Sequence, residues 1–310
     1  MLPLYINWNR FKYAINNNFF KKWTPQMAFI LGLIFSDGNI YNKTLSLKLS
    51  NKHASDRNIL IRINRTMESD YPVEIGSYFF RLRISNPIIL NDVKKLGMIP
   101  NKSKTVRFPN VPAKFLRHFI RGYLDGDGWI TIRNKKLFRE ISIGFCSGSF
   151  CFMKKLVEMI SLYAKISKHN LRKRKKITKK GKISTNYSVE YYSDNAMNLI
   201  KYLYDGLHDE DLYVERKFNK QLEARGVYKE YCCKTRLWRA KEKEFKSDMK
   251  IILADLLRFQ KLDGQQIAEK LGVHSSTIYR WLEKTNIRLT NERGSQKWIK
   301  RVHWKGLQNR

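Results

Sequence analysis

The chain has 310 residues, 61 Lys and Arg against 27 Asp and Glu, a formal charge of +34 and a pI near 10.1. Such a charge favours a polyanionic partner such as nucleic acid and disfavours a strongly basic one. The longest apolar run, residues 27–35, is too short to span a bilayer, so no membrane partner is expected. A hydrophobic content of 43% predicts a sizeable core and two or three domains.

The first predicted helix, residues 25–37, carries a segment that recurs ninety residues later. The two copies read ILGLIFSDG at 30–38 and IRGYLDGDG at 120–128. Each has small residues at i and i+4, which lie on one helix face: Gly32 with Ser36, and Gly122 with Gly126. Two such helices can touch backbone to backbone. Pro25 and Pro112 suit the first position of the two helices.

Both copies end in Asp-Gly. The glycines, Gly38 and Gly128, are expected to stop the helices in a left-handed conformation. Asp37 and Asp127 then lie at helix C-termini, where the dipole is unfavourable for an anion. A divalent cation would offset both the dipole and the repulsion between the carboxylates.

A single Asp-Gly is more simply a polar helix stop before a turn. The downstream pattern argues against coincidence, because strand-like alternation follows both copies. After the first copy, Leu45, Leu47 and Leu49 alternate with Ser46, Lys48 and Ser50; after the second, Ile141 and Ile143 alternate with Ser142 and Gly144.

The two segments resemble the paired motifs of single-chain LAGLIDADG homing endonucleases, over approximately residues 24–225. The resemblance implies an α+β fold of two pseudo-symmetric αββαββα halves that form a saddle over DNA. In the first half it implies strands near 40–50, a helix near 54–67, strands near 72–85 and a helix near 87–97. The second half is expected to repeat this order with a longer second hairpin.

The resemblance also implies roles for individual residues. Asp37 and Asp127 match the final acid of the motif, which binds the catalytic metals in the family. Asp125 matches an earlier acid, but Phe35 takes its place in the first copy, so this position is not expected to be chemically essential. Arg121 replaces a usually small residue and is expected on the outer side of the seam between the helices, as is Leu31.

Four more residues match the family's supporting positions. Lys102 and Lys217 resemble basic residues that flank the active centre and stabilise charge on the phosphate or act on the attacking water. Asn51 and Ser147 fall at the ends of second strands, where a polar residue often positions water. The alternative for all four is a structural surface role.

Phosphodiester hydrolysis needs an activated water and a stabilised leaving oxygen, which metal ions held between carboxylates provide. Mg²⁺ is the expected cofactor, because the ligands are hard oxygens and no His or Cys cluster accompanies them. Two quasi-equivalent sites imply cleavage of both strands of a DNA duplex by a monomer.

A dense basic run at residues 171–182 falls on the predicted second hairpin of the second half. One alternating face would present Arg172, Arg174 and Lys176 to a DNA groove. A solvated hairpin tip or a targeting tract is the alternative.

Beyond residue 225 the composition changes. Residues 234–250 are highly charged and indicate a linker or helical bridge. Apolar positions from 251 to 257 then predict one helix, residues 265–271 a second, and Ser275 or Ser276 caps a third that runs to about 284. The predicted domains are 1–110 with the first motif half, 111–225 with the second, a linker at 226–250, a helix-turn-helix at 251–290 and a basic tail at 291–310.

In this helix-turn-helix, Ala268 is small where two helices cross and Gly272 permits the turn. The positions expected to face DNA bases are Ser276, Thr277, Tyr279 and Arg280. A plain helical hairpin without DNA contact is the alternative, and the basic tail could equally lie along DNA or pack as a C-terminal segment.

Two classes of function compete. The first is a site-specific endonuclease that makes a metal-dependent double-strand break in a long DNA target. The second is a non-cleaving DNA-binding regulator or an intron RNA maturase on the same fold, with its own intron RNA as partner. Retention of both Asp37 and Asp127 favours the endonuclease; an intein is disfavoured, because no nucleophile opens the chain. Cysteine usage and the absence of a signal-peptide layout predict an intracellular protein, in a bacterium, a phage-infected cell or an organelle.

Overall fold

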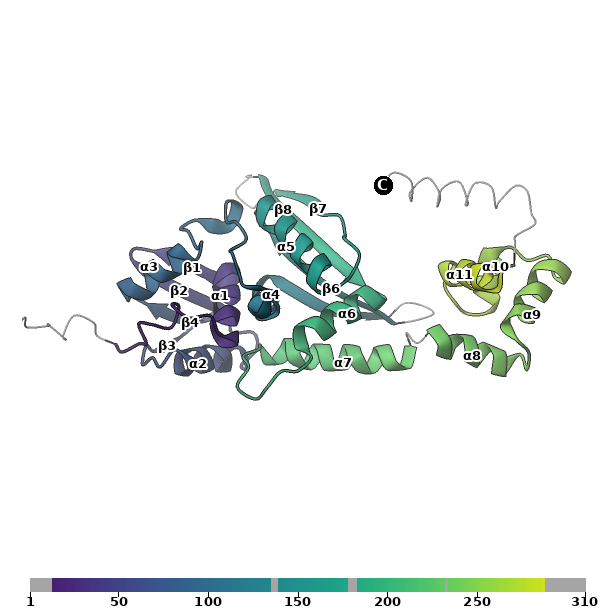
Figure 1. The fold of residues 1–310 in the computed structure, drawn as a ribbon, viewed down its shortest axis with the longest axis horizontal. Coiled ribbons are helices and arrows are strands. Elements are labelled where there is room, and N and C mark those ends of the chain that lie inside the picture. Colours follow the sequence, from purple (N-terminus) through teal and green to yellow (C-terminus); the bar gives the residue numbers. More distant parts are fainter. Residues whose placement is uncertain (1–12, 135–138, 178–182, 232–233, 288–310) are drawn as a thin grey trace, which may run out of the picture. The chain divides into compact units, whose positions relative to one another are not determined.

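The computed structural model describes residues 13–134, 139–177, 183–231 and 234–287 (Figure 1). The chain divides into two compact units: residues 1–133 with 140–228, and residues 134–139 with 229–310. The predicted basic tail at 291–310 lies outside the described residues. In the part of the chain that is described, no helix has the length and apolar character needed to cross a membrane.

The first unit has a mixed helix and sheet fold in two halves with the same order of elements. The first half comprises α1 (Pro25–Asp37), β1 (Gly38–Tyr41), β2 (Thr44–Ser50), α2 (Asp56–Thr66), β3 (Val73–Gly76), β4 (Phe79–Ile84) and α3 (Pro87–Lys95). The second comprises α4 (Leu116–Asp127), β5 (Gly128–Asn134), β6 (Arg139–Ser147), α5 (Phe150–Tyr163), β7 (Arg172–Ile177), β8 (Ile183–Tyr192) and α6 (Ser193–Tyr204). Helix α7 (Glu215–Tyr231) follows.

Each half contributes one four-stranded sheet. The strand orders are β1-β2-β4-β3 and β5-β6-β8-β7, and the β2–β4 and β6–β8 pairs at the two centres are antiparallel. In β2 the leucines point to the core and Ser46, Lys48 and Ser50 point outward, as the alternation predicts. Figure 1 shows α1 and α4 side by side between the two sheets.

Helix α1 is buried along nearly its whole length, because it packs against α4 on one side and its own sheet on the other. Its start is fixed locally: the hydroxyl of Thr24 accepts a hydrogen bond from the Met27 N–H at 3.0 Å, and Pro25 occupies the first turn. Helix α4 starts differently from the prediction. A 3₁₀ turn (Ala113–Phe115) follows Pro112, so α4 begins only at Leu116 and the proline is not its first residue.

The prediction of left-handed glycines at the ends of α1 and α4 is wrong. Gly38 has φ −77° and ψ 148°, and Gly128 has φ −114° and ψ 177°, so both are extended and each begins a strand. Glycine is required here for space. A Cβ at Gly38 would lie 2.9 Å from the Ile34 Cα, and one at Gly128 would lie 2.8 Å from the Leu124 carbonyl oxygen.

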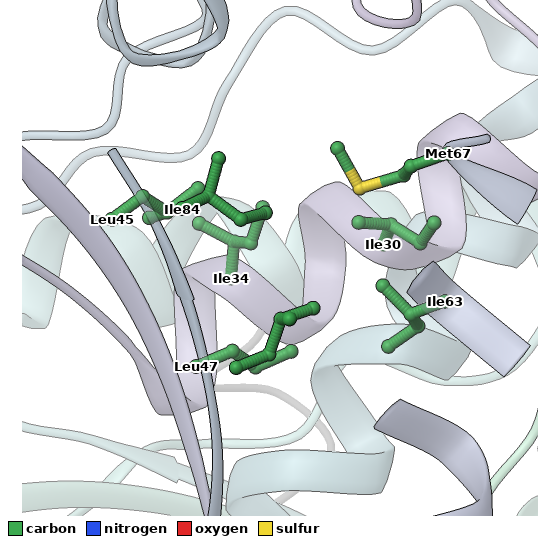
Figure 2. A pocket seen from close by; sticks show the side chains of 8 residues that line it. Ile30, Ile34, Leu45, Leu47, Ile63, Met67 and Ile84 are labelled. Atoms are coloured by element: carbon green, nitrogen blue, oxygen red, sulfur yellow. The ribbon is translucent and has the colours of Figure 1, made fainter. Parts of the chain in front are cut away.

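The core of the first half contains a small cavity (Figure 2). Its volume is about 10 Å³, and its lining is aliphatic apart from one methionine: Ile30, Ile34, Leu45, Leu47, Ile63, Met67, Leu82 and Ile84. A space this small with no polar partner holds neither a ligand nor a stable water. The cavity is therefore a packing defect between α1, α2 and the sheet.

The second unit is helical, with α8 (Lys234–Glu244), α9 (Met249–Ala254), a π-helical turn (Asp255–Phe259), α10 (Gly264–Lys270) and α11 (Ser275–Thr285). Residues 234–244, predicted as a linker or helical bridge, are helical and belong to this unit. Leu237 and Trp238 of α8 pack against the core of this unit, and the Trp238 ring meets Trp281 edge to face at 5.6 Å between centroids. The aromatic residues of a highly charged segment thus make it part of the unit.

The turn between α10 and α11 follows the prediction in part. Gly272 has φ +63°, a conformation that favours glycine, and Ala268 is buried in the core. The cap of α11 is not a serine, however. The His274 side chain accepts from the Ser276 N–H, because His274 is the last extended residue before the helix.

Candidate active site

Helices α1 and α4 approach so closely that side chains are excluded from their crossing. A Cβ on Gly32 would lie 2.9 Å from the Tyr123 nitrogen, and one on Gly122 would lie 3.0 Å from the Leu33 nitrogen; each would also collide with a carbonyl oxygen of the other helix. No residue larger than glycine fits at either position without moving backbone.

The same seam continues to the ends of the helices. The Ser36 hydroxyl turns back to donate to the Leu33 carbonyl at 2.9 Å. A Cβ on Gly126 would overlap this side chain and lie 2.6 Å from Oδ2 of Asp37. The Asp37 carboxylate therefore rests against the last turn of α4, beside Asp127.

The two carboxylates are electrostatically coupled. Burial, followed by the negative charge of Asp127, raises the pKa of Asp37 to about 6, while Lys217, Lys102 and Arg216 oppose the rise. Burial also raises the pKa of Asp127, against the opposing charges of Lys102 and Lys217. The site thus holds two acids that resist ionisation and would gain from a bound cation.

Lys102 closes the C-terminus of α1. It begins a 3₁₀ turn (Lys102–Lys104) and is 9% exposed. Its Nζ donates to the carbonyl oxygens of Phe35, at 2.6 Å, and Ser36. Burial lowers its pKa, but the two aspartates oppose that effect.

Lys217 does the same for α4. It lies in the first turn of α7, and its Nζ donates to four backbone oxygens around the helix end: Leu124, Asp125, Gly126 and Gly128. Burial lowers its pKa to about 8. An ammonium has three donors, so these carbonyls occupy all of them. Both lysines lie where the helix dipole is negative and supply fixed positive charge next to the carboxylates.

Asp125 is buried but takes no part in the carboxylate pair. Its Oδ2 accepts from the Val214 N–H at 2.7 Å, and its Oδ1 lies 3.5 Å from the Tyr204 hydroxyl. Burial raises its pKa to about 6. By fixing Val214, Asp125 holds the start of α7 and therefore Lys217.

Arg121 does not lie on the outer side of the seam, so that prediction is wrong. Its side chain is fully buried and donates to the carbonyls of Leu212 (3.2 Å) and Leu203 (3.1 Å). It also contacts His118 and lies 3.6 Å from the Asp211 carboxylate. Sequence reasoning missed this because the two carbonyls and Asp211 are more than eighty residues away, in α6 and in the segment between α6 and α7.

Arg216 forms a second contact that holds the start of α7, and the sequence did not reveal it. Its Nε lies 3.1 Å from both oxygens of the buried Asp56 carboxylate, at the first residue of α2. Val214 and Arg216, which precede Lys217 in the chain, are thus both held in place. The first half of the unit therefore helps to position a lysine of the second.

The two strand-end residues lie in different surroundings. Ser147 forms a hydrogen bond with the Tyr123 hydroxyl, which also donates to the Cys146 carbonyl, and the Cys146 thiol donates to the Asp127 carbonyl at 3.4 Å. These contacts connect Ser147 to the backbone at Asp127. Asn51 instead uses its amide to bind the carbonyls of Gly76 and Ser77, in the turn between β3 and β4.

The predicted DNA-facing residues are placed on outer surfaces. Lys48 is exposed, and its Nζ lies 4.2 Å from the centre of the Phe79 ring. Arg172 and Arg174 are exposed on β7, whereas the side chain of Lys176 lies outside the described residues. In the helical unit Ser276 and Arg280 are exposed and Thr277 is half-buried.

Tyr279 is only partly exposed. Its ring covers Gly264 at the start of α10, where a Cβ would lie 2.7 Å from the hydroxyl oxygen. Part of the Tyr279 ring is thus used where α10 and α11 cross, and its role as a base-reading residue stays a prediction.

A magnesium ion suits this donor set. Among the described residues no group of three or more His, Cys, Asp or Glu side chains forms a ready metal cage. Asp37 and Asp127 are two partly buried carboxylates that repel each other. Mg²⁺ is commonly held by one or two carboxylates together with waters and substrate phosphates. Asp37 and Asp127 fit this mode, in which the ion binds together with a phosphate-bearing substrate.

No family model and no curated protein matches this sequence. Solved structures with a similar fold include the LAGLIDADG meganuclease I-CpaMI bound to uncleaved DNA, with 13% identity, a TM-score of 0.43, and coverage of 67% of this chain and 93% of that chain. The homing endonuclease I-WcaI bound to its DNA recognition sequence is another, with 13% identity, a TM-score of 0.38, and coverage of 66% and 90%.

Full-length DUF199/WhiA from Thermatoga maritima is also similar, with 13% identity, a TM-score of 0.35, and coverage of 87% of this chain and 94% of that chain. At these identities and TM-scores the likeness carries neither activity nor substrate to this chain.

Proposed function

We propose that this protein is a LAGLIDADG-type homing endonuclease that makes a magnesium-dependent double-strand break in a long DNA target. The observation that carries the proposal is the pair of coupled carboxylates at the adjoining ends of two glycine-faced helices. Asp127 raises the pKa of Asp37, and both carboxylates are flanked by buried ammonium groups. A structural helix stop has no need of two acids that destabilise each other.

Asp37 and Asp127 hold the metal, which supplies an activated water and stabilises the leaving oxygen. Both lysines hold helix ends in place, because each donates to backbone carbonyls. Lys217 uses all three of its donors in this way, whereas Lys102 uses two and keeps one that can act on the phosphate or the water. They favour the ionised form of both aspartates and set the positions of the two helix ends.

The outer faces of the two sheets bind the duplex. Ser46, Lys48 and Ser50 on β2 and Arg172 and Arg174 on β7 provide polar and basic contacts. The helical unit is proposed as a helix-turn-helix in which Ser276, Thr277 and Arg280 lie at or near the start of α11. Both carboxylates come from one chain, so a monomer contains the complete site.

The test uses purified protein, a DNA library and Mg²⁺, with sequencing of the cleaved ends. Asp37→Asn and Asp127→Asn should each reduce cleavage by at least about a hundredfold. Both should still bind the target, because the sheets are unchanged. The matched control is Asp70→Asn, which makes the same change at an exposed carboxylate of the same unit and should cleave like the wild type.

DNA that is bound but never cut, at any Mg²⁺ concentration, would contradict the endonuclease. That result would favour a non-cleaving regulator, and selective binding of a structured intron RNA would favour a maturase.

A further inference from the structure

One glutamate organises two arginines on the outer face of the first sheet. Glu74 of β3 is directly opposite Arg81 of β4 in the antiparallel register, and Arg83 lies two residues further along the same face. Arg81 donates from Nε (2.9 Å) and one terminal nitrogen (2.6 Å) to Oε2 of Glu74. Arg83 donates from Nε to Oε1 at 2.6 Å.

Several contacts hold the cluster of Glu74, Arg81 and Arg83 in place. Burial alone would raise the pKa of Glu74, but the hydrogen bonds from the two arginines outweigh it and lower the pKa, so the carboxylate is ionised. The Arg81 guanidinium also lies over the Phe79 ring, 4.9 Å from its centre. The side chains of Arg81 and Glu74 are 29% and 27% exposed, whereas that of Arg83 is 53% exposed.

The arginines keep donors that the carboxylate does not use. Within the described part of the chain, Nε is the only nitrogen of Arg83 that donates a hydrogen bond, so both of its terminal nitrogens remain. Arg81 uses one edge of its guanidinium and keeps the other terminal nitrogen. A guanidinium held on one edge by a carboxylate presents its remaining donors in a fixed direction, at a reduced entropic cost.

We propose that Glu74 positions Arg81 and Arg83 to recognise guanine bases in the major groove of the target. The inference rests on the proposed function, in which this sheet faces duplex DNA. Guanine offers two acceptors, O6 and N7, on its major-groove edge, and paired donors of arginine match them. Residues two apart on a strand are separated by about 7 Å, which is close to two base-pair steps of about 3.4 Å each. The two guanines therefore lie no more than about two base pairs apart.

In the described part of the second sheet, the outward-facing Glu190 has a different set of partners. It accepts from the neutral donors Trp129 (3.1 Å), Ser142 (2.8 Å) and Tyr192 (2.6 Å), and Arg133 approaches only to 3.4 Å. Its carboxylate thus orders a tryptophan, a serine and a tyrosine rather than a pair of arginines. The guanine pair is therefore proposed for the half-site under the first sheet.

The experiment selects bound duplexes from a randomised library in EDTA, which prevents cleavage, and sequences them. The wild type should enrich guanine roughly tenfold or more at two nearby positions. Arg83→Lys keeps the charge but loses the planar donors, so guanine enrichment should disappear at one position while overall affinity changes little. Arg81→Lys should affect the other position.

Glu74→Gln should weaken enrichment at both positions together, because both guanidinium groups lose their anchor. The matched control is Arg65→Ala, which removes an exposed charge from α2 in the same unit and should leave both preferences intact. Thermal melting of each variant shows whether it is folded, and Arg83→Lys, at an exposed position, provides a test that does not depend on core packing.

The outcomes separate this inference from the proposed function. Wild-type protein that binds no duplex would overturn both. The guanine inference alone would be overturned by a different result. In that result the protein binds duplex DNA and cleaves it when Mg²⁺ is restored, but Arg81→Lys and Arg83→Lys change no guanine preference.

Discussion

At the scale of single residues, the active site is a compromise between charge and burial. Asp37 and Asp127 lie where burial makes ionisation unfavourable, and the charges of Lys102 and Lys217 offset only part of that free energy. Such groups are retained when a ligand completes the charge balance. The stability of the metal-free protein should therefore report on the site directly.

Asp37→Asn should stabilise the metal-free protein at pH 7.5, by about 1–3 kcal/mol. The pKa of Asp37 rises from 3.8 to about 6 on folding, so the folded state holds a proton that the unfolded state releases. The wild type loses stability as the pH rises from about 4 through about 6, and the asparagine variant does not, because it has no carboxyl to ionise. Urea unfolding at a series of pH values measures the difference.

The difference in stability between the wild type and Asp37→Asn should vanish below about pH 4. There the Asp37 carboxyl is protonated in the folded state and in the unfolded state. Mg²⁺ with substrate DNA should reverse the order at pH 7.5, because only the wild type retains both metal ligands. An asparagine variant that is less stable than the wild type by the same amount at every pH would show that Asp37 is a structural hydrogen-bonding residue.

At the scale of elements, the site depends on how closely α1 and α4 approach. Their glycines remove the side-chain layer that normally separates two helices, and this places the carboxylate of one helix against the last turn of the other. Helix α7 then delivers Lys217, with Asp125 fixing Val214 before it and Asp56 fixing Arg216 beside it. Three helices thus determine the position of two acids and one ammonium.

Gly122→Ala should destabilise the first unit by at least about 1–3 kcal/mol, because the added methyl group meets backbone that cannot rotate away. Gly226→Ala is the matched control. Gly226 lies inside α7 with no atom within 4 Å of the new Cβ, so alanine should stabilise the protein by about 0.5–1 kcal/mol.

Denaturant unfolding of both variants measures the contrast. If both substitutions changed the free energy of unfolding equally, the close approach of α1 and α4 would not be what makes Gly122 necessary.

At the scale of the whole molecule, two features bear on the proposed DNA binding: the charge of +34 and the presence of a second compact unit. If about ten basic groups contact phosphates, the logarithm of affinity should fall against the logarithm of salt concentration with a slope of about −9. Linked binding units raise the affinity of the whole chain without a new contact in either.

Deleting residues 234–310 should preserve cleavage at saturating protein, weaken binding and make the salt slope shallower. The boundary follows the packing of Trp238 against Trp281, which makes α8 part of the unit that is removed. Deleting only residues 291–310 is the control that separates the tail from the helices. Titrations at several salt concentrations provide the slopes, and a truncated protein that cannot cut at any concentration would contradict this division of labour.

The amino-acid sequence by itself determined the elements and the acid pair. Small residues four apart, an acid at each helix end and alternating strands are short-range signals, because each depends on the period of one element. The positions of α1 and β2, the outward residues Ser46 and Lys48, and the turn at Gly272 all follow from such signals.

Only the tertiary structure decided what surrounds the two acids and the two arginines beside Glu74. The conformations of Gly38 and Gly128, the burial of Arg121 and the packing of Tyr279 on Gly264 depend on the chain's other segments. Lys217 reaches carbonyls about ninety residues earlier, and Glu74 meets its arginines only through strand register. Local periodicity carries no information about such contacts, because they form when separate elements pack and not within any one of them.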